Sequence, residues 1–185
     1  MILETERLWL RPWEDRNRAP LARILGDPHV RRFYPAPATA AETEAQIDDA
    51  IARSAANGFH FQAAELKATG ALIGLIGIGV IPESTRAVLS GHPRVEIGWQ
   101  LDQAVWGQGL APEGARAWLA YGFDGLGLPE IVAFTAAVNT PSRRVMEKIG
   151  MTRTPADDFA HPRVAEGNPL RPHVLYRLNP PIGRR

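Results

Sequence analysis

Cysteine is absent from this chain of 185 residues. A disulfide framework, a thiolate metal site and a cysteine nucleophile are therefore excluded. Lysine is scarce, with only Lys67 and Lys148, so arginine supplies nearly all of the positive charge. There is also no excess of one sign, because 21 basic residues face 20 acidic ones and the formal net charge is +1. This balance gives no electrostatic footprint for nucleic acid, and we expect none to bind.

Long hydrophobic runs are missing as well. The longest apolar-leaning stretch, residues 71–81, is far shorter than the roughly 20 residues that span a bilayer. The first residues include Glu4, Glu6 and Arg7 and lack the basic-then-apolar layout of a signal peptide. We therefore expect a cytoplasmic protein with no membrane segment.

What is present favours a packed fold. With 45% hydrophobic and 22% charged residues, the chain can bury a core, and its length fits a single domain over residues 1–185. The apolar periodicity and the Gly and Pro positions predict one mixed α/β sheet of about six to seven strands flanked by about four helices. The predicted elements are a strand around residues 8–10, helices at 15–25 and 39–57, strands at 59–66, 71–81 and 95–101, a helix from Pro112 to Gly125, a strand at 131–138, a helix at 140–149 and a strand at 173–178. Residues 82–93 and 154–172 are predicted loops, and residues 179–185 a frayed end.

A pair of glycines lies between a predicted strand and a predicted helix. Gly107 and Gly109 let the backbone curl closely around an anion, and the following helix N-terminus offers unpaired N–H groups with a partial positive charge. This predicts a pyrophosphate site on the main-chain amides of residues 107–111, although a tight turn without a ligand would have a similar sequence. No lysine follows as in a P-loop, and Pro112 stands where a dinucleotide fold needs its third glycine.

A second group of residues decides between a pyrophosphate site and a turn without a ligand. Asn139 opens the pattern N-x-x-S-x-x-V-x-E-K-x-G, with Ser142 at its fourth position, and Glu96-Ile97-Gly98-Trp99 precedes the glycine turn. Together with the opening residues 4–12 (ETERLWLRP), these motifs resemble the GNAT N-acetyltransferase superfamily, specifically its RimJ/RimL-like branch. The resemblance runs in order from about Glu4 to Met151.

The resemblance implies a GNAT-like fold that binds acetyl-CoA. In that superfamily a turn of the form Arg/Gln-x-x-Gly-x-Gly/Ala wraps the pyrophosphate, and Gly109 and Ala111 match its last two positions. Trp106 stands where Arg or Gln is usual, which keeps the backbone donors of the turn but implies no contact from the side chain. Strand 96–101 would splay from strand 131–138, and the pantetheine arm would lie between them. The implied acetyl-CoA contacts are Leu101, Trp106, Gly107, Gln108, Gly109, Leu110, Ala111, Asn139 and Ser142.

Acetyl transfer to a primary amine sets the remaining roles. Glu96 is the candidate base for the amine proton, the alternative being a surface carboxylate that points to solvent. Ser142 is the candidate proton donor to the leaving sulfur, and Asn139 is expected at the pantetheine arm; each could instead be a helix cap or turn residue. A backbone N–H near Leu101 is the candidate oxyanion donor. Without cysteine, direct attack in a ternary complex is favoured over a covalent acyl-enzyme.

The acceptor is left open between a small amine and a protein N-terminus, with specificity expected at residues 33–35 and in loop 82–93. His60, His92, His161 and His173 lack metal-ligand spacing, so no metal is expected. A homodimer is one option that the sequence leaves open. The rival hypotheses are a non-catalytic acyl-CoA-binding regulatory module, a phosphate-binding protein of another fold, and an interaction protein without a ligand.

Overall fold

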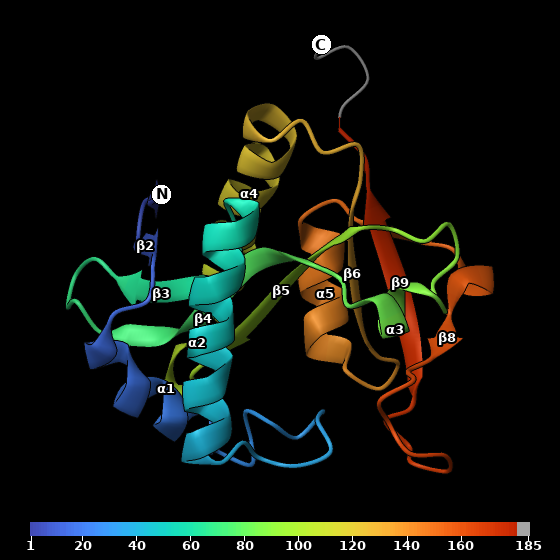
Figure 1. Cartoon of the computed structure of the whole chain (residues 1–185), viewed down its shortest axis with the longest axis horizontal. Helices are drawn as coiled ribbons and strands as arrows, with labels where there is room; N and C mark the ends of the chain where they lie inside the picture. Colours follow the sequence, from blue (N-terminus) through green and yellow to red (C-terminus); the bar gives the residue numbers. More distant parts are fainter. Residues whose placement is uncertain (181–185) are drawn as a thin grey trace. The chain divides into compact units, whose positions relative to one another are not determined.

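The computed structural model describes residues 1–180, and the chain divides into two compact units. Unit 1 comprises Met1–Ile78 and Gly98–Trp118, and unit 2 comprises Gly79–Ile97 and the described chain from Leu119 onward. Strands β4 (Leu72–Val80) and β5 (Val95–Leu101) and helix α4 (Leu110–Ala120) therefore contribute residues to both units. Figure 1 traces these elements along the chain by colour.

Unit 1 contains an antiparallel sheet in the order β1-β2-β3-β4, with the second half of β5 beside β4. The Asp102 N–H donates to the Ile73 carbonyl oxygen at 2.8 Å, which joins the end of β5 to β4. The other elements of this unit are β1 (Leu3–Glu4), β2 (Leu8–Arg11), β3 (Gln62–Leu66), α1 (Arg18–Leu25), α2 (Ala40–Asn57) and the 3₁₀ turns Asp15–Asn17 and Gln103–Val105.

Helices cover both faces of the unit 1 sheet. On one face, α1 and α2 pack against β3 and β4 (Figure 1), in a cluster of Trp13, Leu21, Ile24, Leu25, Ile47, Ala50, Ala63 and Leu75. On the other face, α4 approaches so closely that a Cβ on Gly114 would lie 2.5 Å from Ile76 Cδ1. Leu75 and Ile76 thus point to opposite faces, as the alternation of a strand requires.

The predicted boundaries of α2 are confirmed by its capping groups. Thr39 Oγ1 accepts a hydrogen bond from the Glu42 N–H at 3.2 Å, and Glu42 Oε2 accepts one from the Thr39 N–H at 2.8 Å. Gly58 ends the helix in the left-handed conformation, with φ +81°. Both signals are local in sequence, which is why the pattern alone predicts this helix well.

Unit 2 is a mixed sheet in the order β5-β6-β9-β7, with β8 also paired to β9. β5 runs parallel to β6 (Ile131–Ala136), and β9 (Pro172–Leu178) is antiparallel to β6. Helix α5 (Thr140–Lys148) packs on one face, where Tyr176 Oη donates to Glu147 Oε1 at 3.0 Å. The other face holds a buried cluster of Ile81, Leu89, Val132 and Leu175, with Phe134 and Phe159 packed against it.

The predicted sheet flanked by helices is confirmed, but over residues 1–180 it has nine strands. Three of them, β1, β7 (Thr152–Arg153) and β8 (Phe159–Ala160), have only two residues each and are too short to show a period in the sequence. The predicted loop 82–93 contains a helical turn, α3 (Glu83–Arg86), and the predicted loop 154–172 contains β8 and the 3₁₀ turn Pro155–Asp157.

Other boundaries also differ from the predicted ones. The helix predicted to have Pro112 in its first turn begins at Leu110, so Pro112 does lie in that turn, and it continues as a π-helical turn over Tyr121–Gly125. The strand predicted at 131–138 ends at Ala136, and the strand predicted at 59–66 begins at Gln62. Of the predicted frayed end, residues 181–185 lie outside the described residues. Among the helices within residues 1–180, none is long and apolar enough to cross a bilayer.

Candidate functional site

The glycine turn in unit 1 has the conformation that the sequence predicts for an anion cradle. Gly107 and Gly109 adopt left-handed backbones with φ +77° and +79°, and a Cβ on Gly107 would meet no atom within 4 Å. The Gly109 carbonyl oxygen accepts the Glu113 N–H at 3.2 Å. Helix geometry leaves the N–H groups of Leu110 and Ala111 without an intrahelical acceptor, and Pro112 has no N–H. Two donors and the positive end of α4 therefore lie together.

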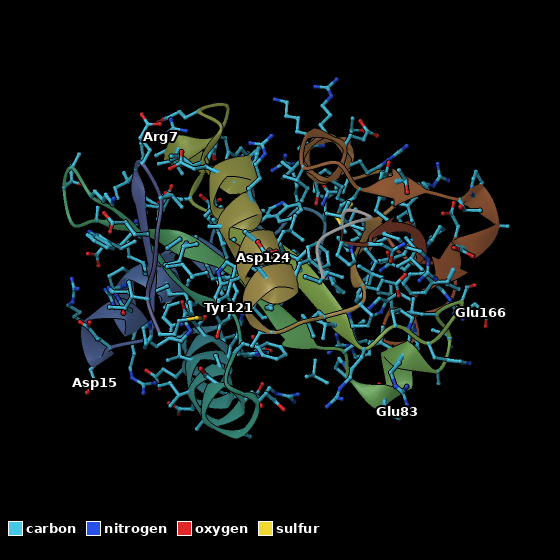
Figure 2. The ribbon with its side chains drawn as sticks, turned by 90° about the horizontal axis from the view of Figure 1, so that it is seen from above. Arg7, Asp15, Glu83, Tyr121, Asp124 and Glu166 are labelled. Carbon is cyan, nitrogen blue, oxygen red and sulfur yellow. The ribbon has the colours of Figure 1, made fainter. Side chains whose placement is uncertain are left out.

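The first turn of α4 is anchored by the N-terminal segment. Glu113 Oε1 accepts hydrogen bonds from Thr5 Oγ1 at 2.6 Å and the Arg7 N–H at 2.8 Å, and Oε2 accepts one from Arg7 Nε at 2.7 Å. Arg7 Nη1 also donates to the Gln108 carbonyl oxygen at 2.9 Å, within the glycine turn itself. Figure 2 shows Arg7 beside this turn. The motif at residues 4–12 thus anchors the glycine turn, a role that its sequence did not reveal.

Replacing Glu113 with alanine is expected to lower the free energy of unfolding at pH 7 by roughly 2 kcal/mol, because the charged hydrogen bonds of Arg7 are lost. Burial acts to raise the pKa of Glu113, but the hydrogen bonds from Thr5 and Arg7 outweigh it and hold that pKa below its ordinary value. The contribution is therefore present at neutral pH and is lost as pH falls through the lowered folded-state pKa. Urea unfolding at pH 7 and pH 3 measures both effects.

The matched control for this prediction is Glu44→Ala, since Glu44 is an exposed carboxylate on α2. A change within about 0.5 kcal/mol is expected for that variant. Equal stability of the Glu113 and Glu44 variants at pH 7 would show that the anchor contributes nothing.

Aromatic and guanidinium groups surround the start of the turn. Trp106 is 39% exposed, and its indole Nε1 donates to the Leu101 carbonyl oxygen at 2.9 Å. The Arg32 guanidinium carbon lies 4.5 Å from the centroid of the Trp106 ring. Arg31 Nη1 donates to Gln100 Oε1 at 3.0 Å, and its guanidinium stacks on Tyr34. Arg31 and Arg32, which directly precede the predicted specificity segment 33–35, therefore contact Gln100 of β5 and Trp106.

Asn139 and Ser142 lie at the start of α5 in unit 2. Asn139 Oδ1 accepts a hydrogen bond from the Ser142 N–H at 3.2 Å, and Asn139 Nδ2 donates to Thr135 Oγ1 at 2.8 Å. Asn139 is thus the N-cap of α5, three residues beyond the end of β6. The amide carries two hydrogens, and within the described chain, residues 1–180, only one of them has an acceptor.

Glu96 lies on β5 directly opposite Val132 of the parallel strand β6. Opposite residues of neighbouring strands share a face, so Glu96 lies on the face that carries Phe134 and Leu175. The side chain is half-buried rather than fully exposed. Burial raises the pKa of Glu96 to about 7, against the opposing effect of the positive charge of Arg163. A carboxyl that titrates near neutral pH is suited to accept an amine proton.

Each of the predicted site residues lies in one of the two units. Unit 1 holds Leu101, Trp106 and the turn 107–111, and unit 2 holds Glu96, Asn139 and Ser142. Sequence reasoning missed Thr5, Glu113 and Arg32, whose partners lie more than 70 residues away along the chain. No local pattern could have found them. Within residues 1–180, no group of three or more His, Asp or Glu side chains is arranged to hold a metal.

Comparison with known proteins adds independent evidence. Residues 7–152 match the family model described as an acetyltransferase (GNAT) domain. The uncharacterized protein YkkB of Bacillus subtilis is 34% identical over 150 residues, which are 80% of this chain and 84% of that protein. An Aspergillus fumigatus protein named FsC-acetyl coenzyme A-N(2)-transacetylase is 30% identical over 151 residues, which are 81% of this chain and 64% of that protein.

A solved structure shares the fold over nearly the whole length. The crystal structure of an acetyltransferase (GNAT family) from Bacillus anthracis superimposes with a TM-score of 0.78 at 27% identity, covering 97% of this chain and 98% of that chain. The family model spans residues of both units and well over half of the chain. The chain therefore belongs to the GNAT family and is an acetyltransferase.

Proposed function

We propose that this acetyltransferase, as a RimJ/RimL-like member, moves the acetyl group of acetyl-CoA to a primary amine by direct attack in a ternary complex. The observation that carries the proposal is the open left-handed turn at Gly107 and Gly109 ahead of α4. Its residues fit a pyrophosphate, because a Cβ at either glycine would be strained and the turn exposes main-chain donors to an anion. Acetyl-CoA, when bound, supplies the activated thioester.

The predicted site residues have separate roles in the proposed chemistry. Main-chain N–H groups of residues 107–111 hold the pyrophosphate, and the main chain near Leu101 binds the pantetheine arm and donates to the carbonyl oxygen. Glu96 accepts the proton of the attacking amine. The Asn139 amide contacts the pantetheine arm, and the Ser142 hydroxyl donates to the departing sulfur. One C–N bond forms and one C–S bond breaks, and the proton released by the amine balances the one taken up by the thiolate.

The test combines binding and turnover. We expect CoA to raise the melting temperature of the wild-type protein, because a ligand that binds only the folded state stabilises it. We also expect acetyl-CoA to release free thiol in the presence of an amine from a panel of small amines and peptides. Gly107→Ala should weaken the CoA shift, since its methyl group strains a φ of +77° within the phosphate turn.

The control variant is Gly58→Ala, whose glycine has φ +81° and equally open surroundings at the end of α2. It should carry a similar strain and keep the full CoA shift. A CoA shift without thiol release from any amine would favour the rival acyl-CoA-binding regulatory module. No CoA shift at all would overturn both functions.

The remaining expectations stay predictions: a single domain over residues 1–185, a cytoplasmic location, no metal and the option of a homodimer. The proposed function also leaves both acceptors open, a small amine and a protein N-terminus.

A further inference from the structure

Four aromatic rings gather on the Glu96 face of unit 2. Phe134 comes from β6, Phe159 from β8, His161 follows β8, and His173 lies on β9. Their ring centroids lie 4.6 to 6.5 Å apart, with the closest approach between the two histidines. None of these rings was assigned a role from the sequence. They form an aromatic wall on the same face as the candidate base, with ring planes tilted by 38° to 80° from one another.

A cavity of about 610 Å³ opens beside this wall, which is a volume typical of ligand sites. Its lining is mostly apolar and includes Ala137, Phe159, Ala160, Pro169, Pro172 and His173. Two residues of the lining are charged. Asp158 is neutralised by Arg153, whose Nε donates to Asp158 Oδ1 at 2.9 Å. Arg171 has no ion pair within residues 1–180, so the cavity offers a cation to an anionic ligand.

The hydrogen bonds of the two histidines determine which ring nitrogen of each carries the hydrogen. His173 Nδ1 lies 3.1 Å from the Arg171 carbonyl oxygen, which can only accept, so this nitrogen carries the hydrogen. His161 Nδ1 accepts the Arg163 N–H at 3.2 Å. Burial lowers the pKa of both rings, with the nearby His173 and Arg163 adding to the effect at His161, so both are neutral at pH 7. The cavity lining therefore carries one unpaired positive charge, that of Arg171. A single charge matches a carboxylate better than a phosphate dianion.

Strand register gives the distance from this cavity to Glu96. Glu96 lies opposite Val132, Val132 lies opposite Arg177, and His173 lies four residues from Arg177 along β9. At about 3.3 Å per residue, the row of His173 is some 13 Å along the strands from the row of Glu96, and the row of Arg171, two residues farther, is about 20 Å from it. An α-amino acid, whose amine and carboxylate share one carbon, cannot reach both. An extended peptide of three residues spans roughly 10 Å, and the long side chains of Arg171 and Glu96 together supply the remaining distance of about 10 Å.

We propose that the cavity receives the carboxylate-bearing, apolar third residue of a tripeptide acceptor whose N-terminal amine lies at Glu96. The Arg171 guanidinium binds the carboxylate, and Phe159 with His173 packs against an aromatic side chain. This inference rests on the proposed acetyl transfer, and it narrows the acceptor from any amine to a short peptide. In the transfer step the peptide amine gains the acetyl group and loses a proton to Glu96, while the thiolate leaves.

The first experiment measures binding without turnover. N-acetyl-Gly-Gly-Phe has a blocked amine and cannot be acetylated, so its affinity is measured by calorimetry without acetyl-CoA. We expect Arg171→Gln to weaken its binding by about 10- to 100-fold, as the loss of a charge-assisted hydrogen bond predicts. The control is Arg94→Gln, since Arg94 is exposed in the same unit and absent from the lining. That variant should bind as the wild type does.

The second experiment measures thiol release with matched acceptors. We expect kcat/KM to be at least tenfold higher for Gly-Gly-Phe than for Gly-Gly-Phe-amide or phenylalanine, and Arg171→Gln to remove that preference. Equal kcat/KM for the acid and the amide, or equal binding of the blocked peptide by the wild type and Arg171→Gln, would overturn the cavity assignment while acetyl transfer stands. Arg171-dependent binding with no thiol release from any amine would overturn the proposed function instead.

Discussion

Replacing Glu96 with glutamine is expected to lower kcat by 10²- to 10⁴-fold, the range that loss of a general base covers. Glutamine keeps the size of the side chain but cannot accept the amine proton, and KM for acetyl-CoA should change little. The wild-type rate should rise with pH through about 7, where the carboxyl loses its proton, and the variant should lack this limb. Thiol-release kinetics from pH 5.5 to 8.5 measure both features.

The same variant has a distinctive effect on stability. Because the folded-state pKa of Glu96 is raised to about 7, the wild type loses stability as pH rises from the unfolded value near 4.5 through 7. Glutamine does not titrate, so Glu96→Gln should be more stable than the wild type by roughly 1–3 kcal/mol at pH 8. This advantage should vanish at pH 4.

Glu166→Gln serves as the control for Glu96, because Glu166 is an exposed carboxylate of the same unit (Figure 2). Neither its activity nor its stability should depart from the wild type. Full activity of Glu96→Gln would remove Glu96 as the base and leave a water chain to take the proton. A loss of activity accompanied by lower stability at pH 8 would mean that Glu96 acts by holding the fold.

Replacing Gly74 with alanine is expected to destabilise unit 1 by roughly 3–5 kcal/mol, combining backbone strain with a steric clash. Gly74 lies in β4 beside the register shift between β3 and β4, with φ +135°. A Cβ there would lie 2.1 Å from the Gln100 carbonyl oxygen, so β5 would have to move. The end of β5 carries Leu101, so binding of CoA should fall as well.

The control separates strain from clash. Gly70→Ala introduces a methyl group at a φ of +68° with no atom within 4 Å, so only the conformational cost of about 1 kcal/mol is expected. Urea unfolding of both variants, followed by circular dichroism, gives the two free energies. If Gly74→Ala unfolds at the same urea concentration as Gly70→Ala, the close approach of β5 to β4 is not what fixes Gly74.

The correct predictions rest on interactions between residues that are close in sequence. The capping groups of α2 and the Asn139–Pro141 start of α5 act over three residues, so their sequence contains all of the interaction. The left-handed turn at Gly107 and Gly109 is likewise a property of neighbouring residues. By contrast, two-residue strands such as β7 and β8 form only because β9 lies beside them. Two residues are too few to show a hydrophobic period from which such strands could be predicted.

By itself, the sequence determined the mixed sheet with its helices, the left-handed glycine turn and, through spaced motifs, the acetyltransferase family. Only the tertiary structure decided that Thr5 and Arg7 anchor Glu113, that Glu96 is half-buried, and that the His161 ring lies 4.6 Å from that of His173, which lines a cavity with Arg171. The physical reason is that capping and turn conformation depend on adjacent residues. Burial, and the pKa that it shifts, depends on which distant segments pack together.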